Sequence, residues 1–245
     1  MPNDLTLLMP VYNEESRIKE TVQLWLKTLS SLDIQFQILI VNDGSTDATE
    51  SILKELSADQ RVLIRTQKNH GHGPAILSGY RQAVEKSAWV FQCDSDHEIS
   101  DEHFPALWAR RNEFDALLGI RQNRSQHPVR KWLSLVSRLT ILVLFKKYCA
   151  DVNTPYRLMR SDILKQFVGQ IPADTFAPNV ILTGSFLRNG LKVYTYPVSH
   201  QNKREKGKLS HHFKIFSSAF KSFRQTLSIR PAISQTSKEP ISTSL

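Results

Sequence analysis

Short apolar runs alternate along the first hundred residues with stretches in which apolar residues recur every three or four positions. The runs are typical of buried β-strands, and the periodic stretches are typical of helices with one apolar face. The predicted strands are Leu5–Val11, Phe36–Val41, Arg61–Thr66 and the run ending at Phe91. The predicted helices are Glu14–Ser31 with Asn13 as its N-cap, Asp47–Ser57, and a segment from the loop Asn69–Pro74 to Lys86. Strands that are buried on both faces produce such continuous apolar runs, so the pattern predicts an α/β fold with a mostly parallel sheet and helices on both faces.

The second half of the chain continues this pattern less regularly. A strand is predicted at Glu113–Gly119, and a helix is predicted at Pro178–Asn189, closed by Gly190. Lys192–Val198 alternates between apolar and polar residues, as an edge strand does.

Two further helices are predicted, at Val129–Lys147 and Phe213–Leu227. The apolar centre of the first is about 21 Å long, too short for a bilayer core, and Arg138 lies within it. The second has five large apolar residues on one face and lysines and arginines on the others, as interfacial helices do. This second helix is expected either to lie in a membrane interface or to pack on the domain. The expected organisation is one domain over residues 1–211, the amphipathic helix over 212–228, and a disordered tail over 229–245.

Composition and charge indicate which kinds of partner the protein can bind. The 245 residues carry a net charge of +9, which indicates an anionic partner such as a phosphorylated substrate or an anionic membrane. Nucleic acid is not expected, because the basic residues are scattered and no aromatic residues interleave with them. The two cysteines, Cys93 and Cys149, form neither a metal-binding spacing nor a disulfide framework. The N-terminus has no signal-peptide pattern, so we expect a cytoplasmic-side protein.

Polar residues follow three of the predicted strands. Tyr12–Asn13–Glu14 follow the first, Asp43 follows the second, and Asp94 and Asp96 follow the fourth. The carboxyl ends of parallel strands meet at one edge of a sheet, where open α/β sheets bind ligands. Two close carboxylates repel each other unless a cation lies between them, and Mg²⁺ is usually held by one or two carboxylates plus substrate phosphates. An isolated Asp-x-Asp is also compatible with a solvated turn, but three clusters at one edge favour a ligand site.

The motifs now assembled resemble those of a family-two glycosyltransferase with the GT-A, Rossmann-like fold. The matching segments are PVYNE (10–14), VNDGSTD (41–47), NHGHGPAILSGYRQA (69–83) and DSD (94–96). Later segments are similar to those of polyprenyl-phosphate sugar transferases of the dolichol-phosphate mannose or glucose synthase type: Arg121, DVNTPYR (151–157) and KREKGKLS (203–210). That family usually has Asp-Ala-Asp-Leu-Gln where this chain has Asp94–Glu98, so Glu98 adds a charge beside the metal.

The resemblance implies a role for each matching residue. The nucleotide of a nucleotide-sugar donor is expected to contact Pro10, Tyr12, Glu14, Asp43, Asp94 and Asp96. Mg²⁺ or Mn²⁺ is expected on Asp94, Asp96 and Glu98, where it would neutralise the leaving diphosphate. The expected acceptor is a polyprenyl phosphate, held by Arg121, Arg130, Arg157, Arg204 and Lys208.

The catalytic residues expected from the resemblance are Asp96, Asp151 and Arg157. A phosphate acceptor is already an anion and can attack the sugar directly, with inversion. A hydroxyl acceptor needs a base, for which Asp151 is the candidate. Two alternatives remain open: transfer to a soluble hydroxyl acceptor such as a glycan precursor, and nucleotide-sugar binding without turnover. We expect peripheral attachment to the membrane through Val129–Lys147 and Phe213–Leu227.

Overall fold

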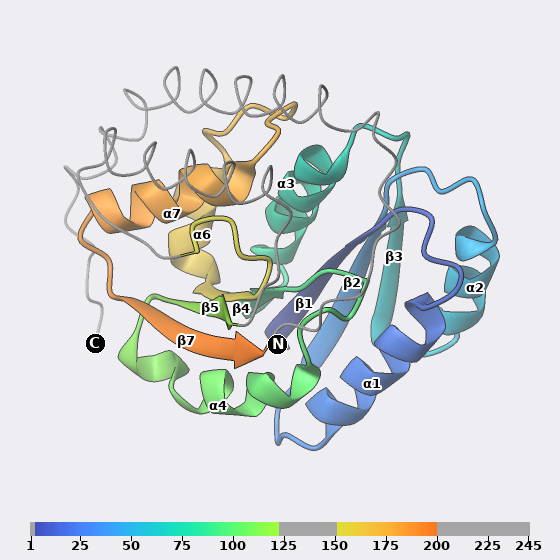
Figure 1. Cartoon of the computed structure of the whole chain (residues 1–245), viewed down its shortest axis with the longest axis horizontal. Helices are drawn as coiled ribbons and strands as arrows, with labels where there is room; N and C mark the ends of the chain where they lie inside the picture. Colours follow the sequence, from blue (N-terminus) through green and yellow to red (C-terminus); the bar gives the residue numbers. More distant parts are fainter. Residues whose placement is uncertain (1–2, 123–150, 200–245) are drawn as a thin grey trace.

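The computed structural model describes residues 3–122 and 151–199. Within these residues, seven strands form one sheet in the order β3-β2-β1-β4-β6-β5-β7 (Figure 1). They are β1 (Asn3–Val11), β2 (Phe36–Asn42), β3 (Val62–Thr66), β4 (Ser87–Gln92), β5 (Ala116–Gln122), β6 (Arg157–Arg160) and β7 (Val193–Ser199). All pairings are parallel except those of β6, which runs antiparallel to both β4 and β5. The predicted mostly parallel α/β sheet is confirmed.

Helices cover both faces of the sheet (Figure 1). On one face lie α1 (Ile18–Ser30), α2 (Thr49–Leu56) and α4 (Phe104–Ala109). On the other lie α3 (His72–Ala83), α6 (Ser161–Val168) and α7 (Pro178–Arg188). Two 3₁₀ turns, Asp101–His103 and Arg111–Glu113, flank α4.

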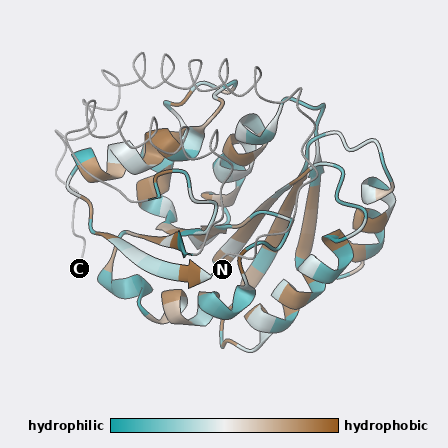
Figure 2. Cartoon of the chain, in the orientation of Figure 1, coloured by the Kyte–Doolittle hydropathy of each residue, from teal (hydrophilic) through white to brown (hydrophobic). Residues whose placement is uncertain are grey.

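The alternation of side chains along each strand builds two cores. In β1, Leu7 and Met9 pack toward α1, whereas Leu8 packs toward α3. At the centre of the first core, the ring of Trp25 lies 5.3 Å from that of Phe91 in β4. Burying each such side chain stabilises the fold by about 1.5–3 kcal/mol. Figure 2 shows hydrophobic residues gathered on the central strands and on the helix sides that face them.

One local prediction in the first half is wrong. Helix α1 begins at Ile18 rather than Glu14, and its N-cap is Arg17, without a side-chain cap. Asn13 instead adopts a left-handed backbone, φ 54°, and its side-chain oxygen accepts a hydrogen bond from Thr46 N at 2.8 Å. A side chain that is committed to the neighbouring loop cannot also cap its own helix.

In the second half, the edge strand and the helix closed by Gly190 are confirmed, with Gly190 in the left-handed region at φ 72°. The strand predicted at Glu113–Gly119 begins only at Ala116, because a 3₁₀ turn occupies Arg111–Glu113. None of the helices that the structure describes is long and apolar enough to cross a bilayer. The predicted helices Val129–Lys147 and Phe213–Leu227, the tail 229–245 and Cys149 lie outside the described residues, so the proposed domain boundaries stay predictions.

Candidate active site

The carboxyl ends of β1, β2 and β4 lie side by side. Val11 is paired with Asn42, and Leu8 with Gln92, so the residues that follow these strands converge on one edge of the sheet. A cavity of about 660 Å³ opens there. Its lining includes all six residues that were expected to contact the donor: Pro10, Tyr12, Glu14, Asp43, Asp94 and Asp96. Their individual roles stay predictions, but the structure brings them together.

Hydrogen bonds join the loop after β1 to the loop after β2. Asn13 N donates to Ser45 Oγ at 3.0 Å, and Thr46 N donates back to Asn13 Oδ1. Glu14 N donates to Thr49 Oγ1 at 2.9 Å. These bonds hold Tyr12 and Glu14 beside Asp43. Sequence reasoning missed this role of Asn13, although its place between two polar strand ends was the available signal.

Asp43 is buried, with 3% of its surface exposed, and supports the next loop of the cavity. Its Oδ1 accepts from Gln67 Nε2 at 2.8 Å and from His70 N at 3.0 Å, and its Oδ2 accepts from Gly71 N at 2.8 Å. The carboxylate therefore fixes the segment that leads into α3. Oδ2 keeps one lone pair for a further donor.

Acidic side chains dominate the electrostatics of the cavity. Burial is the largest cause that raises the pKa of Glu14, and the charges of Asp96, Asp47 and Asp94 raise it further. Burial also raises the pKa of Asp94, opposed by His72 and aided by Asp96. Among the described residues, Asp94 Oδ1 has no hydrogen-bond donor. This group of carboxylates attracts cations.

His72 is the one basic side chain among the described residues that line this cavity. It is the first residue of α3, it is 61% exposed, and its Nε2 lies 3.7 Å from Asp94 Oδ1, beyond hydrogen-bond distance. The next residue, Gly73, has no space for a side chain, because a Cβ there would overlap the main chain of Thr175 and Phe176. This close contact packs α3 against the loop before α7. Sequence reasoning did not assign His72 to the site.

No group of three or more histidine, cysteine or acidic side chains is placed to hold a metal ion by itself in the part of the chain that the structure describes. The expected set of Asp94, Asp96 and Glu98 therefore does not form a complete protein site. Carboxylates completed by substrate phosphate oxygens fit this arrangement and fit the usual ligation of Mg²⁺.

A scan against protein-family models matches residues 6–168, more than half of the chain, to the family described as Glycosyl transferase family 2. The chain belongs to glycosyl transferase family 2. This membership confirms the expected family and the expected class of enzyme, and the Asp-x-Asp turn after β4 lies within the matched residues.

Curated relatives bear names that specify an acceptor. The chain is 28% identical over 207 residues to an undecaprenyl-phosphate 4-deoxy-4-formamido-L-arabinose transferase of Edwardsiella ictaluri, covering 83% of this chain and 61% of the relative. A protein of the same name from Salmonella choleraesuis is 28% identical over 203 residues, covering 81% and 60%. The chain thus spans about three fifths of the length of these relatives.

Solved structures support the fold. Glucosyl-3-phosphoglycerate synthase of Mycobacterium tuberculosis, solved with Mn²⁺, UDP-glucose and phosphoglyceric acid, gives a TM-score of 0.67 at 15% identity, covering 94% of this chain and 80% of that one. TarS of S. aureus, solved with UDP-GlcNAc, gives 0.57 at 19% identity, covering 94% and 71%. At these identities the likeness shows a shared fold, and it confirms the expected GT-A architecture.

Arg121, expected to bind the acceptor, and Asp151, expected to be catalytic, bond to each other. Arg121 Nε and Nη2 donate to Asp151 Oδ2 and Oδ1 at 2.7 and 2.9 Å, and both side chains are largely buried. Burial alone would lower the pKa of Arg121, but the hydrogen bonds and charge of Asp151 raise it. A void of about 20 Å³, room for one water molecule or ion, lies between Arg121 and the acids Asp94, Asp96 and Glu98.

The structure places Arg157 in the protein interior, and its expected catalytic and phosphate-binding roles stay predictions. This residue is fully buried, and its guanidinium donates to the main-chain oxygens of Val152, Thr154 and Asn179. These contacts hold the loop before β6 and the start of α7 around the guanidinium. Its charge still lowers the pKa of Asp94. Arg130, Arg204 and Lys208 lie outside the described residues.

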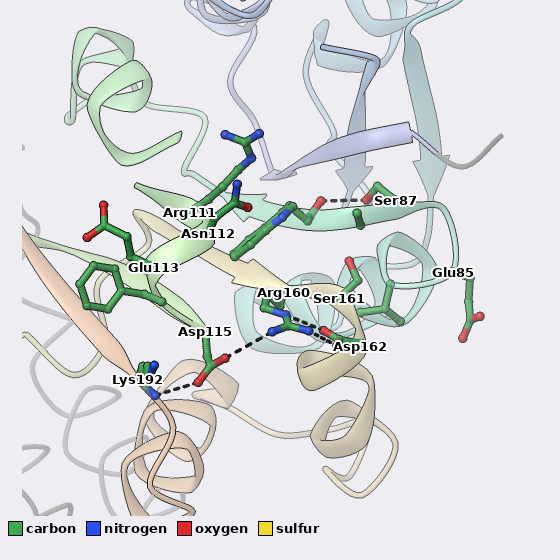
Figure 3. A pocket seen from close by; sticks show the side chains of 14 residues that line it. Glu85, Ser87, Arg111, Asn112, Glu113, Asp115, Arg160, Ser161, Asp162 and Lys192 are labelled. Atoms are coloured by element: carbon green, nitrogen blue, oxygen red, sulfur yellow. Dashed lines mark hydrogen bonds and ion pairs between the residues drawn. The ribbon is translucent and has the colours of Figure 1, made fainter. Parts of the chain in front are cut away.

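A second cavity, of about 670 Å³, opens at the opposite edge of the sheet (Figure 3). There each lining carboxylate is paired: Asp115 and Asp162 with Arg160, Glu113 with Arg110, and Glu85 with Lys165. The two cavities are similar in volume but differ in charge. Of the two, the cavity at the carboxyl edge gathers acids that repel one another, and such a group attracts a cation.

Proposed function

We propose that the chain transfers a hexose from a GDP- or UDP-linked donor to a polyprenyl phosphate, with Mg²⁺ or Mn²⁺ as cofactor. The observation that carries this proposal is the cavity of about 660 Å³ at the carboxyl edge, which is lined by the six residues expected to contact the donor. The names of the curated relatives support a polyprenyl-phosphate acceptor, and structural neighbours solved with UDP-sugars support a nucleotide-sugar donor.

The donor nucleotide is assigned to the part of the cavity between β1 and β2. Tyr12 is 47% exposed and offers a ring face on which a base can stack. The free lone pair of Asp43 Oδ2 suits a donor group of the base, and Glu14 suits the ribose hydroxyls.

The diphosphate is assigned to the turn after β4. Asp94 and Asp96 are the proposed ligands, because Asp94 Oδ1 lacks a hydrogen-bond donor among the described residues. Burial raises the pKa of Glu14, and the charges of Asp96 and Asp94 raise it further, so both acids lie close to Glu14. A divalent cation bound there would neutralise the leaving diphosphate as a Lewis acid. His72, at the start of α3, lies 3.7 Å from Asp94 Oδ1 and would face the same diphosphate.

In the proposed reaction, a phosphate oxygen of the acceptor attacks the anomeric carbon of the sugar. The bond from that carbon to the nucleoside diphosphate breaks, and the configuration inverts. Nη1 of Arg121 makes no hydrogen bond to the described residues, so Arg121 can donate to the acceptor phosphate while Asp151 holds its other nitrogens. The contribution of the protein is then positioning and charge stabilisation.

Transfer to a hydroxyl acceptor is the second candidate, and the geometry does not favour it. Its base would be Asp151, both of whose carboxylate oxygens accept hydrogen bonds from Arg121. A carboxylate bonded in this way is a weak base.

The test is an assay of the purified protein with a panel of UDP- and GDP-sugars, Mn²⁺ or Mg²⁺, and farnesyl phosphate or farnesol, with products identified by mass spectrometry. We expect transfer of the sugar to farnesyl phosphate and no transfer to farnesol. Asp96→Asn should reduce kcat at least about a hundredfold, whereas Asp162→Asn, in the second cavity, should change kcat little. Transfer to farnesol would favour the hydroxyl acceptor, and donor binding without any product would favour a binding protein.

Membrane attachment is proposed to occur through Val129–Lys147 and Phe213–Leu227. The sequence of the first has an apolar centre, and that of the second is basic and amphipathic. Flotation with vesicles that contain anionic lipid tests this proposal. The protein should float with them at low salt and less so at 0.5 M salt, because surface charge is screened. Failure to float with anionic vesicles at low salt would refute the attachment.

A further inference from the structure

The turn Asp94–Glu98, which carries the candidate metal ligands, contains an unfavourable backbone conformation. His97, at its fourth position, has φ 52°, in the left-handed region, which few residues other than glycine adopt, although asparagine, aspartate and histidine are enriched there. Within the turn, Glu98 N donates to Asp96 Oδ1 at 3.0 Å. From outside, Thr21 Oγ1 of α1 donates to Ser95 O at 3.1 Å. A conformation of this kind persists only where its surroundings hold it in place.

The side chain of His97 supplies a second, indirect link to α1, through Asp101. Its Nε2 lies 3.1 Å from Asp101 Oδ1, and Asp101 Oδ2 accepts a hydrogen bond from Thr28 Oγ1. The His97 and Asp101 side chains are 19% and 11% exposed. Burial alone would raise the pKa of Asp101, but the hydrogen bonds from Thr28 and His97 lower it. The turn is therefore joined to α1, which is itself fixed by the packing of Trp25 on Phe91.

We propose that His97 is a positioning residue: through Asp101 and Thr28 it fixes the Asp94–Glu98 turn on α1 and so sets where Asp96 meets the metal-bound diphosphate. This inference rests on the proposed function of the turn. Asp101 and Thr28 serve His97 rather than the substrate, since neither lines the cavity at the carboxyl edge.

Matched variants separate the contact from the backbone strain. His97→Leu removes the hydrogen bond, whereas His97→Gln keeps an N–H near the place of the imidazole Nε2. Neither leucine nor glutamine is among the residues enriched in the left-handed region, so the contact with Asp101 is the main difference between the two variants. Thr28→Val removes the hydrogen bond from Thr28 to Asp101 while preserving the shape of the side chain.

The first measurement needs no ligand. Hydrogen exchange of the peptide that spans residues 94–101 should be about tenfold faster in His97→Leu and Thr28→Val than in the wild type, as expected for loss of one hydrogen bond to a charged group. The rate in His97→Gln should stay within about threefold of the wild-type rate. Equal exchange in His97→Leu and the wild type would overturn the proposal.

The second measurement is calorimetric binding of UDP and GDP with and without Mn²⁺. His97→Leu should weaken Mn²⁺-dependent binding about tenfold and leave metal-free binding unchanged, and His97→Gln should restore most of the loss. An equal loss of Mn²⁺-dependent binding in His97→Leu and His97→Gln would show that the contact with Asp101 does not position the turn. A wild-type protein that binds neither nucleotide would refute the proposed function, while the exchange rates would still decide the positioning role.

Discussion

Asp43→Asn tests whether one buried carboxylate organises the donor side of the cavity. The substitution preserves the size of the side chain but replaces one oxygen with an N–H₂ group. Three donors point at the carboxylate: Gln67 Nε2 and His70 N at Oδ1, and Gly71 N at Oδ2. An amide can accept from only one side, so at least one of these donors then faces another donor.

The expected loss follows from these contacts. If the amide oxygen keeps the two bonds at the Oδ1 position, the bond from Gly71 N is lost and its donor is left unsatisfied, which costs about 2 kcal/mol. The two surviving bonds lose the charge of their acceptor and weaken by about 0.5 kcal/mol each. The total is about 3 kcal/mol, provided that the loop stays in place. A loop that opens instead would limit the loss but would free the amides of His70 and Gly71.

Urea unfolding and hydrogen exchange together measure both outcomes. Asp43→Asn should lower the free energy of unfolding by up to about 3 kcal/mol or sharply accelerate exchange at residues 69–71, and in either case weaken nucleotide binding. Asp33→Asn is the matched control: Asp33 is exposed, and its change should stay within about 0.5 kcal/mol. A change below about 0.5 kcal/mol in Asp43→Asn, with unchanged exchange at His70 and Gly71, would refute this account of the loop.

Three further predictions concern other parts of the site. Gly73→Ala should lower the free energy of unfolding, measured in urea, by about 2 kcal/mol, because the added methyl group overlaps the main chain of the loop before α7. The control Gly169→Ala should leave stability unchanged, since a Cβ at Gly169 meets nothing within 4 Å. Equal effects of the two substitutions would contradict this packing. Asp151→Asn should lower the free energy of unfolding by about 3 kcal/mol in the same assay, since it leaves the charged and nearly buried Arg121 without its partner carboxylate. A large loss of kcat at unchanged stability would instead indicate that Asp151 is a catalytic base. Asp94→Asn should raise the free energy of unfolding of the ligand-free protein at pH 7 by about 1 kcal/mol. The raised pKa of Asp94 means that its ionisation opposes folding, so the gain should disappear as the pH falls below about 4, where Asp94 is protonated in both states; a gain that is independent of pH would contradict this.

The succession of strands and helices in the first hundred residues and the edge that carries the site could be predicted from sequence, because both depend on regular patterns. Buried parallel strands give continuous apolar runs, and each run in the first hundred residues ends where the structure ends a strand, within a residue or two. The convergence of Glu14, Asp43 and Asp94 then follows from parallel pairing alone.

Contacts between loops could not be predicted in this way. Asn13 has the residue type of a helix cap, yet it binds Thr46 from the next strand end, a contact with no signature in local sequence. Arg157 has the residue type of a phosphate ligand, but its burial among main-chain carbonyls depends on how β6 inserts antiparallel between β4 and β5. His72 was missed because its relevance comes from its distance to Asp94 rather than from its spacing to other histidines.

Electrostatics identifies the functional edge of the sheet without reference to any family. The two cavities are of nearly equal volume, but each acid that lines the cavity at the opposite edge is paired with an arginine or lysine, Asp115 and Asp162 with the same Arg160. At the carboxyl edge, burial raises the pKa of Glu14, and the charges of Asp96 and Asp94 raise it further, an arrangement that destabilises the folded state. A fold keeps such repulsion where a bound cation relieves it. Ligand binding should therefore stabilise this protein more with a nucleoside diphosphate and Mn²⁺ together than with either alone, since each supplies the charge that the other lacks.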